Sequence, residues 1–133
     1  MTIVVWVFAL FAAATHILVF VWESVLFSRP GVHEKVFAIP TTDVPSVLLW
    51  SFCVGFYNLF LALGLITGVI AWATGSVTVG MTLVIYICLF MVLCGVVLFA
   101  ADRMALGRKR GKGIGGVLGE TIPPLLALLA LLF

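Results

Sequence analysis

The hydrophobic pattern divides the chain into four long apolar segments separated by short polar stretches. Each segment is rich in Leu, Val, Ile and Phe, and none alternates apolar and polar residues as a barrel strand does. A helix needs about 20 residues to cross the hydrocarbon core of a bilayer, and in that core a helix satisfies all its backbone hydrogen bonds internally. We therefore predict an all-α, polytopic transmembrane bundle of four helices, one domain over residues 1–133, with spans at about 2–27, 46–73, 78–101 and 114–133.

Composition agrees with this pattern. The chain is 65% hydrophobic and only 9% charged, whereas a soluble domain is roughly half apolar and about a quarter charged. The bilayer must therefore act as the solvent for most of the surface. Gly111, Gly113 and Gly116 match the spacing GxGxxG, but no strand precedes them, so we expect neither a nucleotide site nor a nucleic-acid partner.

The charges predict an orientation. Four crossings place loops 28–45 and 102–113 on one side of the membrane and both termini on the other. All seven Lys and Arg residues lie on the loop side, namely Arg29, Lys35, Arg103, Arg108, Lys109, Arg110 and Lys112. The positive-inside rule then makes both loops cytoplasmic and both termini external, in a multi-pass protein of the cell (plasma) membrane.

The two long loops differ in character. In the first loop, Val32, Val36 and Ile39 recur at helical spacing, which predicts a short amphipathic segment in the membrane interface; His33 and Glu34 are expected to be solvated. The third loop is strongly basic, and we expect it to contact anionic lipid headgroups through Arg108, Lys109, Arg110 and Lys112.

Polar residues inside the spans are the candidates for function, because an ionisable group is costly in a bilayer. His16 and Glu23 are seven residues apart, which places them on one helix face at a separation of about 10 Å. The second span carries Tyr57 and Asn58, and the fourth carries Glu120. Counted inward from the cytoplasmic side, Glu23 and Glu120 have similar depth, whereas His16 and Asn58 lie deeper. We predict that these groups converge on one cavity in which the two carboxyls share a proton or are bridged by His16 or a cation.

The fourth span also has an unusual backbone. Pro123 and Pro124 remove the amide donors for the carbonyls of Gly119 and Glu120. Those carbonyls could serve a ligand, or the prolines could simply kink the helix. Small residues favour close helix approach, so we expect a homodimer or small homo-oligomer that shares the glycine-rich faces, formed by Gly64, Gly68, Gly115, Gly116 and Gly119.

Two classes of function fit this polar set. The first is a binding or transport module in which His16, Glu23, Tyr57, Asn58 and Glu120 hold a small lipophilic or proton-linked ligand. The second is an acid–base enzyme for isomerisation, cyclisation or epoxide opening of a lipophilic substrate, with Glu23 or Glu120 as the general acid, His16 as its partner and Tyr57 or Asn58 orienting the substrate. A third reading is a structural subunit of a larger membrane complex, which needs no site.

No residue pattern in the sequence identifies a cofactor. One His and two carboxylates from three helices are a weak signature for a metal, so we predict no metal site; His16, Glu23 and Glu120 would be the ligands of one.

Three motifs carry a family resemblance. They are His16 with Glu23, the run Gly55-Phe-Tyr-Asn-Leu-Phe-Leu-Ala-Leu-Gly64, and Gly119-Glu-Thr-Ile-Pro123. Through them nearly the whole chain resembles domain-of-unknown-function family 1304, small four-helix membrane proteins of bacteria and fungi. The resemblance implies an integral membrane protein and implies no activity. It also implies that many relatives carry Gln at the position of Glu120, so that a second carboxylate is not essential to the family.

Overall fold

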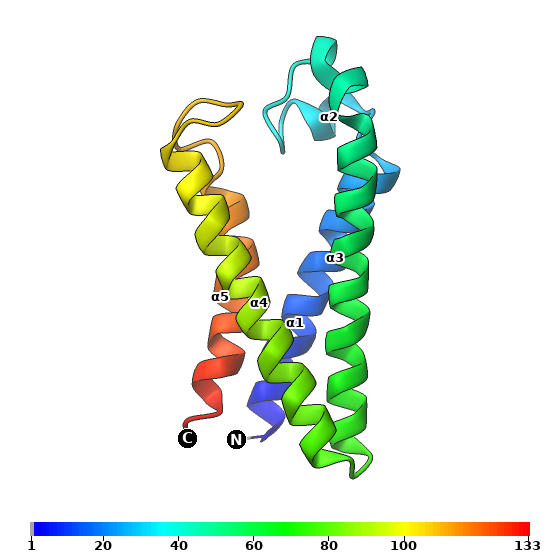
Figure 1. Ribbon diagram of the computed structural model, residues 1–133, viewed down its shortest axis with the longest axis vertical. Helices are drawn as coiled ribbons and strands as arrows, with labels where there is room; N and C mark the ends of the chain where they lie inside the picture. The colour runs from blue at the N-terminus through cyan, green and yellow to red at the C-terminus, as the bar shows by residue number, and fades with distance from the viewer. Residues whose placement is uncertain (1) are drawn as a thin grey trace.

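The computed structural model describes residues 2–133, and every regular element in that range is a helix (Figure 1). Helix α1 (Thr2–Phe20) continues into a π-helical turn, η1 (Val21–Val25). The first loop contains the short α2 (Pro30–His33) and a 3₁₀ turn, η2 (Thr41–Asp43). Three further helices follow: α3 (Val44–Ala73), α4 (Val77–Arg103) and α5 (Ile114–Ala130). The prediction of an all-α bundle is confirmed.

The four long helices run alternately up and down. Both termini and the turn at 74–76 lie at one end, here called the terminal end, and the loops at 26–43 and 104–113 lie at the other, the loop end (Figure 1). Helices α1 and α4 each pack against both α3 and α5, while α1 and α4 barely touch each other. The order around the bundle is therefore α1, α3, α4, α5, with antiparallel neighbours throughout.

Three of the four helices are long and apolar enough to cross a membrane, and α5 is a shorter apolar helix. Its 17 residues give a length of about 25 Å at 1.5 Å per residue, the lower limit for a span. The predicted fourth span ended at residue 133, whereas the helix ends at Ala130. Pro123 and Pro124 are both buried, and α5 continues through them.

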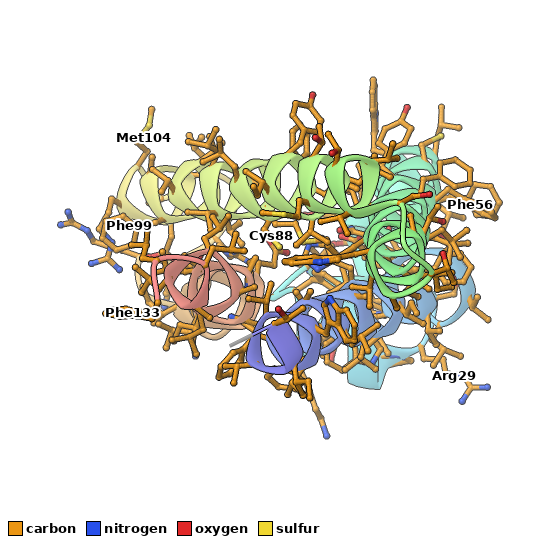
Figure 2. The ribbon with its side chains drawn as sticks, turned by 90° about the horizontal axis from the view of Figure 1, so that it is seen from below. Arg29, Phe56, Cys88, Phe99, Met104 and Phe133 are labelled. Carbon is orange, nitrogen blue, oxygen red and sulfur yellow. The ribbon has the colours of Figure 1, made fainter. Side chains whose placement is uncertain are left out.

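The main hydrophobic cluster occupies the terminal half of the bundle. Small side chains of α1 meet large ones of α3 and α4 there, in a buried cluster of Val5, Ala9, Ala12, Ala13, Ala62, Leu65, Val69, Val84, Ile87, Cys88, Met91, Ala127 and Ala130. Viewed from the terminal end, Cys88 points into the centre, while Phe99, Met104 and Phe133 point outward (Figure 2). The outer surface is apolar, as a lipid-facing surface must be.

One of the two predicted glycine faces serves packing within the chain. A Cβ on Gly64 would come within 2.8 Å of Ile87 Cδ1, and one on Gly68 within 3.0 Å of Leu83 Cβ. These glycines let α4 approach α3 closely, so that face is not free for a second copy. A Cβ on Gly115 would meet nothing within 4 Å.

Towards the loop end, the α1–α3 pair diverges from the α4–α5 pair (Figure 1). Helices α1 and α5 still approach at Thr15 and Gly119, where a Cβ on the glycine would lie 3.9 Å from Thr15 Cγ2. One turn nearer the loop end, the space beside Gly115 is open. The bundle therefore has the shape of a V whose apex lies near Thr15 and Gly119.

The first loop folds differently from the prediction. His33 is buried, not solvated: its Nδ1 donates to the Ile39 carbonyl (3.0 Å), and the Ile39 N–H donates back to the His33 carbonyl (2.7 Å). Val32 is also buried, so the segment packs on the protein, although Val36 stays exposed. The cause is Ala38, whose φ of 57° turns the chain back on itself. Glu34 is exposed, as expected.

The third loop is tied down by Asp102, which follows the last residue of the predicted span at 78–101. This buried carboxylate accepts hydrogen bonds from the backbone N–H groups of Gly111 (2.8 Å) and Gly113 (2.7 Å) and pairs with Arg103 (2.6 Å). Together the Arg103 guanidinium and the two backbone N–H groups provide hydrogen-bond donors to both oxygens of the Asp102 carboxylate.

Candidate functional site

The site begins at the π-helical turn η1, in which α1 widens and the Leu26 N–H bonds the Val21 carbonyl (2.9 Å). Single π turns inside α-helices frequently occur at functional sites. Two serines fasten this turn to α3 by exchanging hydrogen bonds with opposite backbones. Ser24 Oγ donates to the Phe52 carbonyl (2.9 Å), and Ser51 Oγ donates to the Glu23 carbonyl (2.9 Å).

Gly55 makes this close approach possible. A Cβ at that position would overlap the Ser24 Oγ and would lie 3.0 Å from Glu23 Cβ. Gly55 lies four residues after Ser51 and three before Asn58, so the three residues share one face of α3. The spacing Ser51-x-x-x-Gly55-x-x-Asn58 could have identified Ser51 from the sequence, because it places three small or polar residues on one helical stripe.

Asn58 holds the carboxylate of Glu23. Its Nδ2 donates to Glu23 Oε2 (2.9 Å) and to the Val54 carbonyl of its own helix (3.2 Å). The Glu23 backbone is level with Ser51, and the Glu23 Cβ lies beside Gly55, so Asn58 lies about one helical turn deeper along α3. The two side chains bridge this difference in depth and meet. Because Ser51 and Phe52 are level with η1, the first turns of α3 extend beyond the end of α1.

His16 is buried on α1, with 2% of its surface exposed. Its Nδ1 donates to the Ala12 carbonyl (2.9 Å), and its Nε2 forms no hydrogen bond within residues 2–133. The neighbouring Thr15 contacts α5 at Gly119. His16 thus lies beside the apex of the V, whereas the π turn directs Glu23 onto α3, and no hydrogen bond joins the two side chains.

Glu120 projects from α5, directly after the apex contact at Gly119. It is half-buried and accepts no hydrogen bond from the described part of the chain. It lies within electrostatic range of Glu23 and of Arg108. The Arg108 guanidinium packs over Gly113 at the start of α5, an approach that the sequence pattern did not indicate.

A further polar group of α5 was missed by sequence reasoning. Thr121 Oγ1 is buried without a hydrogen-bond partner. It packs against Gly95 of α4, where a Cβ would overlap it. Thr121 lies within the Gly119–Pro123 motif, but nothing in that motif indicates that its hydroxyl is buried.

Tyr57 does not join the other predicted residues. It is 62% exposed on the outer surface, where it borders an apolar groove between α3 and α4 together with Phe60, Leu61, Ile87 and Phe90. Adjacent residues on a helix point about 100° apart, so Tyr57 and Asn58 cannot face the same site. Within residues 2–133, the structure also brings together no group of three His, Cys, Asp or Glu side chains that could hold a metal.

The sequence was compared with protein-family models, with curated proteins and with solved structures. The model described as "Protein of unknown function (DUF1304)" matches residues 10–132. The chain belongs to family DUF1304. This confirms the resemblance noted in the sequence, and with the apolar helices it identifies a membrane protein. No curated protein and no solved structure matches the chain.

All the candidate residues lie in the part of the chain that the DUF1304 model covers. The hydrogen-bonded set of Ser24, Ser51, Glu23 and Asn58 and the facing Glu120 fall within residues 10–132. The candidate site of this DUF1304 protein is thus an acidic region between α1, α3 and α5, held by a π turn above the apex of the V.

Proposed function

We propose that this protein is a membrane-embedded binding module for a small lipophilic cation, which it takes up in exchange for a proton. The observation that carries the proposal is the placement of Glu23. Asn58 orients its carboxylate through Oε2, and Oε1 accepts no hydrogen bond from residues 2–133. One carboxylate oxygen therefore stays available to a ligand.

The charges around this carboxylate support a ligand with one positive charge. Glu23 and Glu120 lie within range of each other, and Arg108 lies within range of Glu120. Arg108 can balance one carboxylate, which leaves one negative charge in a region of low dielectric. A proton or a lipophilic cation would neutralise it, and the two would compete for the same place.

The geometry also favours binding over acid–base catalysis. The catalytic hypothesis used Tyr57 or Asn58 to orient a substrate, but Tyr57 lies outside the bundle and the amide of Asn58 is engaged with Glu23 and Val54. A binding function requires only carboxylates that a ligand can reach, and Glu23 and Glu120 are each only half-buried.

We further propose that the loop end faces the cytoplasm of the cell membrane, as the positive-inside rule requires. Every Lys and Arg residue lies at the loop end or in its loops, and none lies at the terminal end. The basic residues of the loop at 104–113 would then lie at the level of anionic headgroups, within about a Debye length of the surface.

Tetraphenylphosphonium, a permanent lipophilic cation, tests the proposed function. Its binding to purified protein in a neutral detergent is measured by equilibrium dialysis at pH 8.5 and pH 5.5. We expect weaker binding at the lower pH, because protonation removes the negative charge, and release of a proton on binding in weakly buffered solution. Glu23→Gln, which keeps the size of the side chain, should abolish the binding.

The matched control is Glu34→Gln. Glu34 is an exposed loop residue whose carboxylate accepts a hydrogen bond from Thr41 (2.6 Å), so its loss should leave the binding unchanged. Binding by Glu23→Gln equal to that of the wild type, or binding that does not depend on pH, would refute the proposal.

A further inference from the structure

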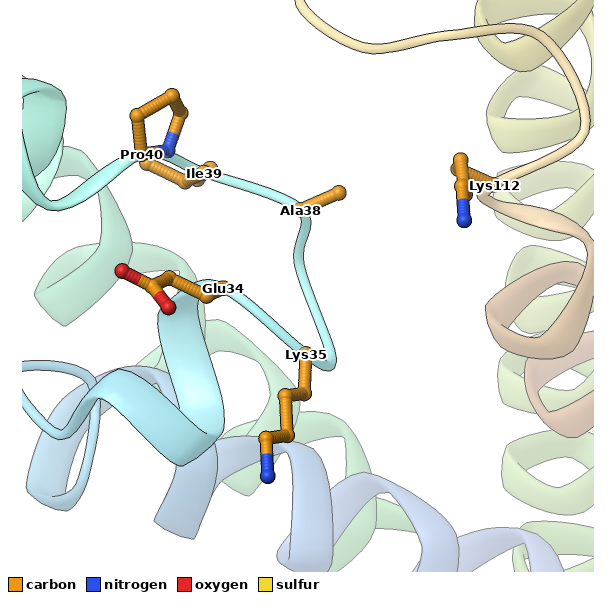
Figure 3. A pocket seen from close by; sticks show the side chains of 6 residues that line it. All are labelled: Glu34, Lys35, Ala38, Ile39, Pro40 and Lys112. Carbon is orange, nitrogen blue, oxygen red and sulfur yellow. The ribbon is translucent and has the colours of Figure 1, made fainter.

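A pocket opens at the loop end, between the two diverging halves of the bundle. It has a volume of about 520 Å³ and is lined by Glu34, Lys35, Ala38, Ile39, Pro40 and Lys112. Five of these residues come from the first loop, and Lys112 comes from the loop before α5. Figure 3 shows Lys112 facing the loop of Lys35 and Ala38 across open space. The pocket is separate from the acidic site and includes neither Glu23 nor Glu120.

The pocket carries uncompensated positive charge. The ion pair between Arg103 and Asp102 is the only one within residues 2–133, so neither Lys35 nor Lys112 is paired. Glu34 is the one acidic residue in the lining; its carboxylate accepts the Thr41 hydroxyl (2.6 Å) and keeps its negative charge, so two lysines and one glutamate leave the lining with one net positive charge. The neighbouring residues Lys109 and Arg110 add to the positive potential. The pocket is therefore suited to an anion.

The pocket wall that carries Lys35 is fixed by hydrogen bonds and buried contacts. His33 and Ile39 exchange two hydrogen bonds, at 2.7 Å and 3.0 Å, which close the loop into a ring. The His33 ring is buried and packs near Phe27, with ring centroids 6.3 Å apart. Ala38 holds a φ of 57°, a conformation that is unfavourable for a residue with a Cβ. Because buried contacts hold this strained loop in place, the pocket wall is preorganised.

We propose that this pocket binds a phosphate group, coordinated by Lys35 from one half of the bundle and Lys112 from the other. Lysine binds phosphate as a point charge, and two ammonium groups on opposite walls can share one dianionic or monoanionic phosphate. The volume exceeds what a bare phosphate needs and lies within the range of small-molecule sites, about 300–1,000 Å³. The phosphate can come from an anionic phospholipid headgroup or from free phosphate. Bound there, it links the two halves at the open end of the V.

The test measures the binding of two probes to purified protein in a neutral detergent. Native mass spectrometry and titration follow dioctanoyl phosphatidic acid as the lipid probe and inorganic phosphate as the free anion. We expect one phosphatidic acid molecule to be retained per chain. Lys35→Gln and Lys112→Gln should each weaken its binding at least about tenfold, equivalent to about 1.4 kcal/mol. The double variant should be little weaker than either single one, because both lysines bind one group.

Lys109→Gln is the matched control. It removes the same charge from the same loop as Lys112 but from outside the pocket lining, and it should change the affinity less than about twofold, equivalent to about 0.4 kcal/mol. Inorganic phosphate that competes with the lipid at equal affinity would assign the site to free phosphate; much weaker competition would assign it to the headgroup.

Two results would overturn the proposal. One is equal weakening by Lys109→Gln and Lys112→Gln, which would mean diffuse attraction to a basic surface. The other is retention of the lipid by the Lys35/Lys112 double variant. Lys35 and Lys112 are exposed loop residues, so circular dichroism should show that the Lys35→Gln and Lys112→Gln variants fold. Tetraphenylphosphonium binding at the acidic site should persist in both variants. Loss of phosphate binding with cation binding intact separates this inference from the proposed function.

Discussion

Gly55→Ala tests how the π turn docks on α3. The new Cβ would overlap the Ser24 Oγ and would lie 3.0 Å from Glu23 Cβ and 3.1 Å from the Ser24 backbone nitrogen. The Ser24 hydroxyl would have to leave its 2.9 Å hydrogen bond to the Phe52 carbonyl. The turn itself would have to move by a few tenths of an ångström, since the other close atoms belong to the backbone and to a Cβ.

The magnitude follows from three contributions. Overpacking of a tight contact costs about 1–3 kcal/mol, and loss of an interhelical hydrogen bond in a membrane costs about 0.6 kcal/mol. Alanine returns about 1 kcal/mol through its higher helix propensity. We therefore expect Gly55→Ala to lower the free energy of unfolding by roughly 0.6–2.6 kcal/mol.

The assay is unfolding in mixed micelles by increasing mole fraction of SDS, followed by far-ultraviolet circular dichroism. Gly115→Ala is the matched control, because its Cβ would meet nothing within 4 Å; it should be neutral or stabilising by up to about 1 kcal/mol. Adding Ser24→Ala removes the overlapping oxygen, so the double-mutant cycle should give a coupling free energy of at least about 0.5 kcal/mol. If Gly55→Ala and Gly115→Ala unfold at the same SDS fraction, α3 and the π turn do not approach as closely as described.

Three further predictions concern the site, the third loop and the orientation. A cycle with Asn58→Leu and Glu23→Leu, each of which removes one partner of the hydrogen bond, should give a coupling of about 0.6–1.7 kcal/mol in the same unfolding assay, and a value of zero would mean that the amide does not hold the carboxylate. Asp102→Asn removes the ion pair with Arg103 and replaces one acceptor oxygen with an amide donor, so it should lower the free energy of unfolding by about 1–3 kcal/mol in the same assay. An unchanged unfolding midpoint would mean that this carboxylate does not hold the third loop. A reporter that is active only outside the cytoplasm should be active when fused after Phe133 and inactive when inserted at Lys109, and the reverse pattern would invert the proposed orientation.

The polar and glycine residues of the spans show where sequence reasoning reached its limit. Glu23, Asn58 and Glu120 were recognisable because polar groups in apolar spans are costly and therefore rare. Their alignment was not predictable, because the overhang of α3 beyond α1 depends on the π turn and on Gly55. Gly64 and Gly68 were recognised as contact residues, but only the fold shows that α4, in the same chain, occupies their face.

His33 and Tyr57 are two further residues whose environment the sequence did not predict. A histidine in a polar loop predicts solvent exposure, yet the reversal at Ala38 brings Ile39 back to His33 and buries its ring. Tyr57 stands beside Asn58 in the sequence, yet it faces outward, because successive helical residues point in different directions.

The sequence by itself determined that a lipid bilayer surrounds the protein, that its regular structure is helical, and that its long helices run alternately up and down. Those properties depend on local quantities: the number of consecutive apolar residues, the backbone hydrogen bonds that a bilayer forces inside each helix, and the connections that return the chain. The tertiary structure alone decided which polar groups meet, because a contact between helices depends on their relative register. Here that register is set by one widened turn, two exchanged serine hydrogen bonds and a glycine without a Cβ, which join Glu23 to Asn58 and leave His16 beside the apex of the V.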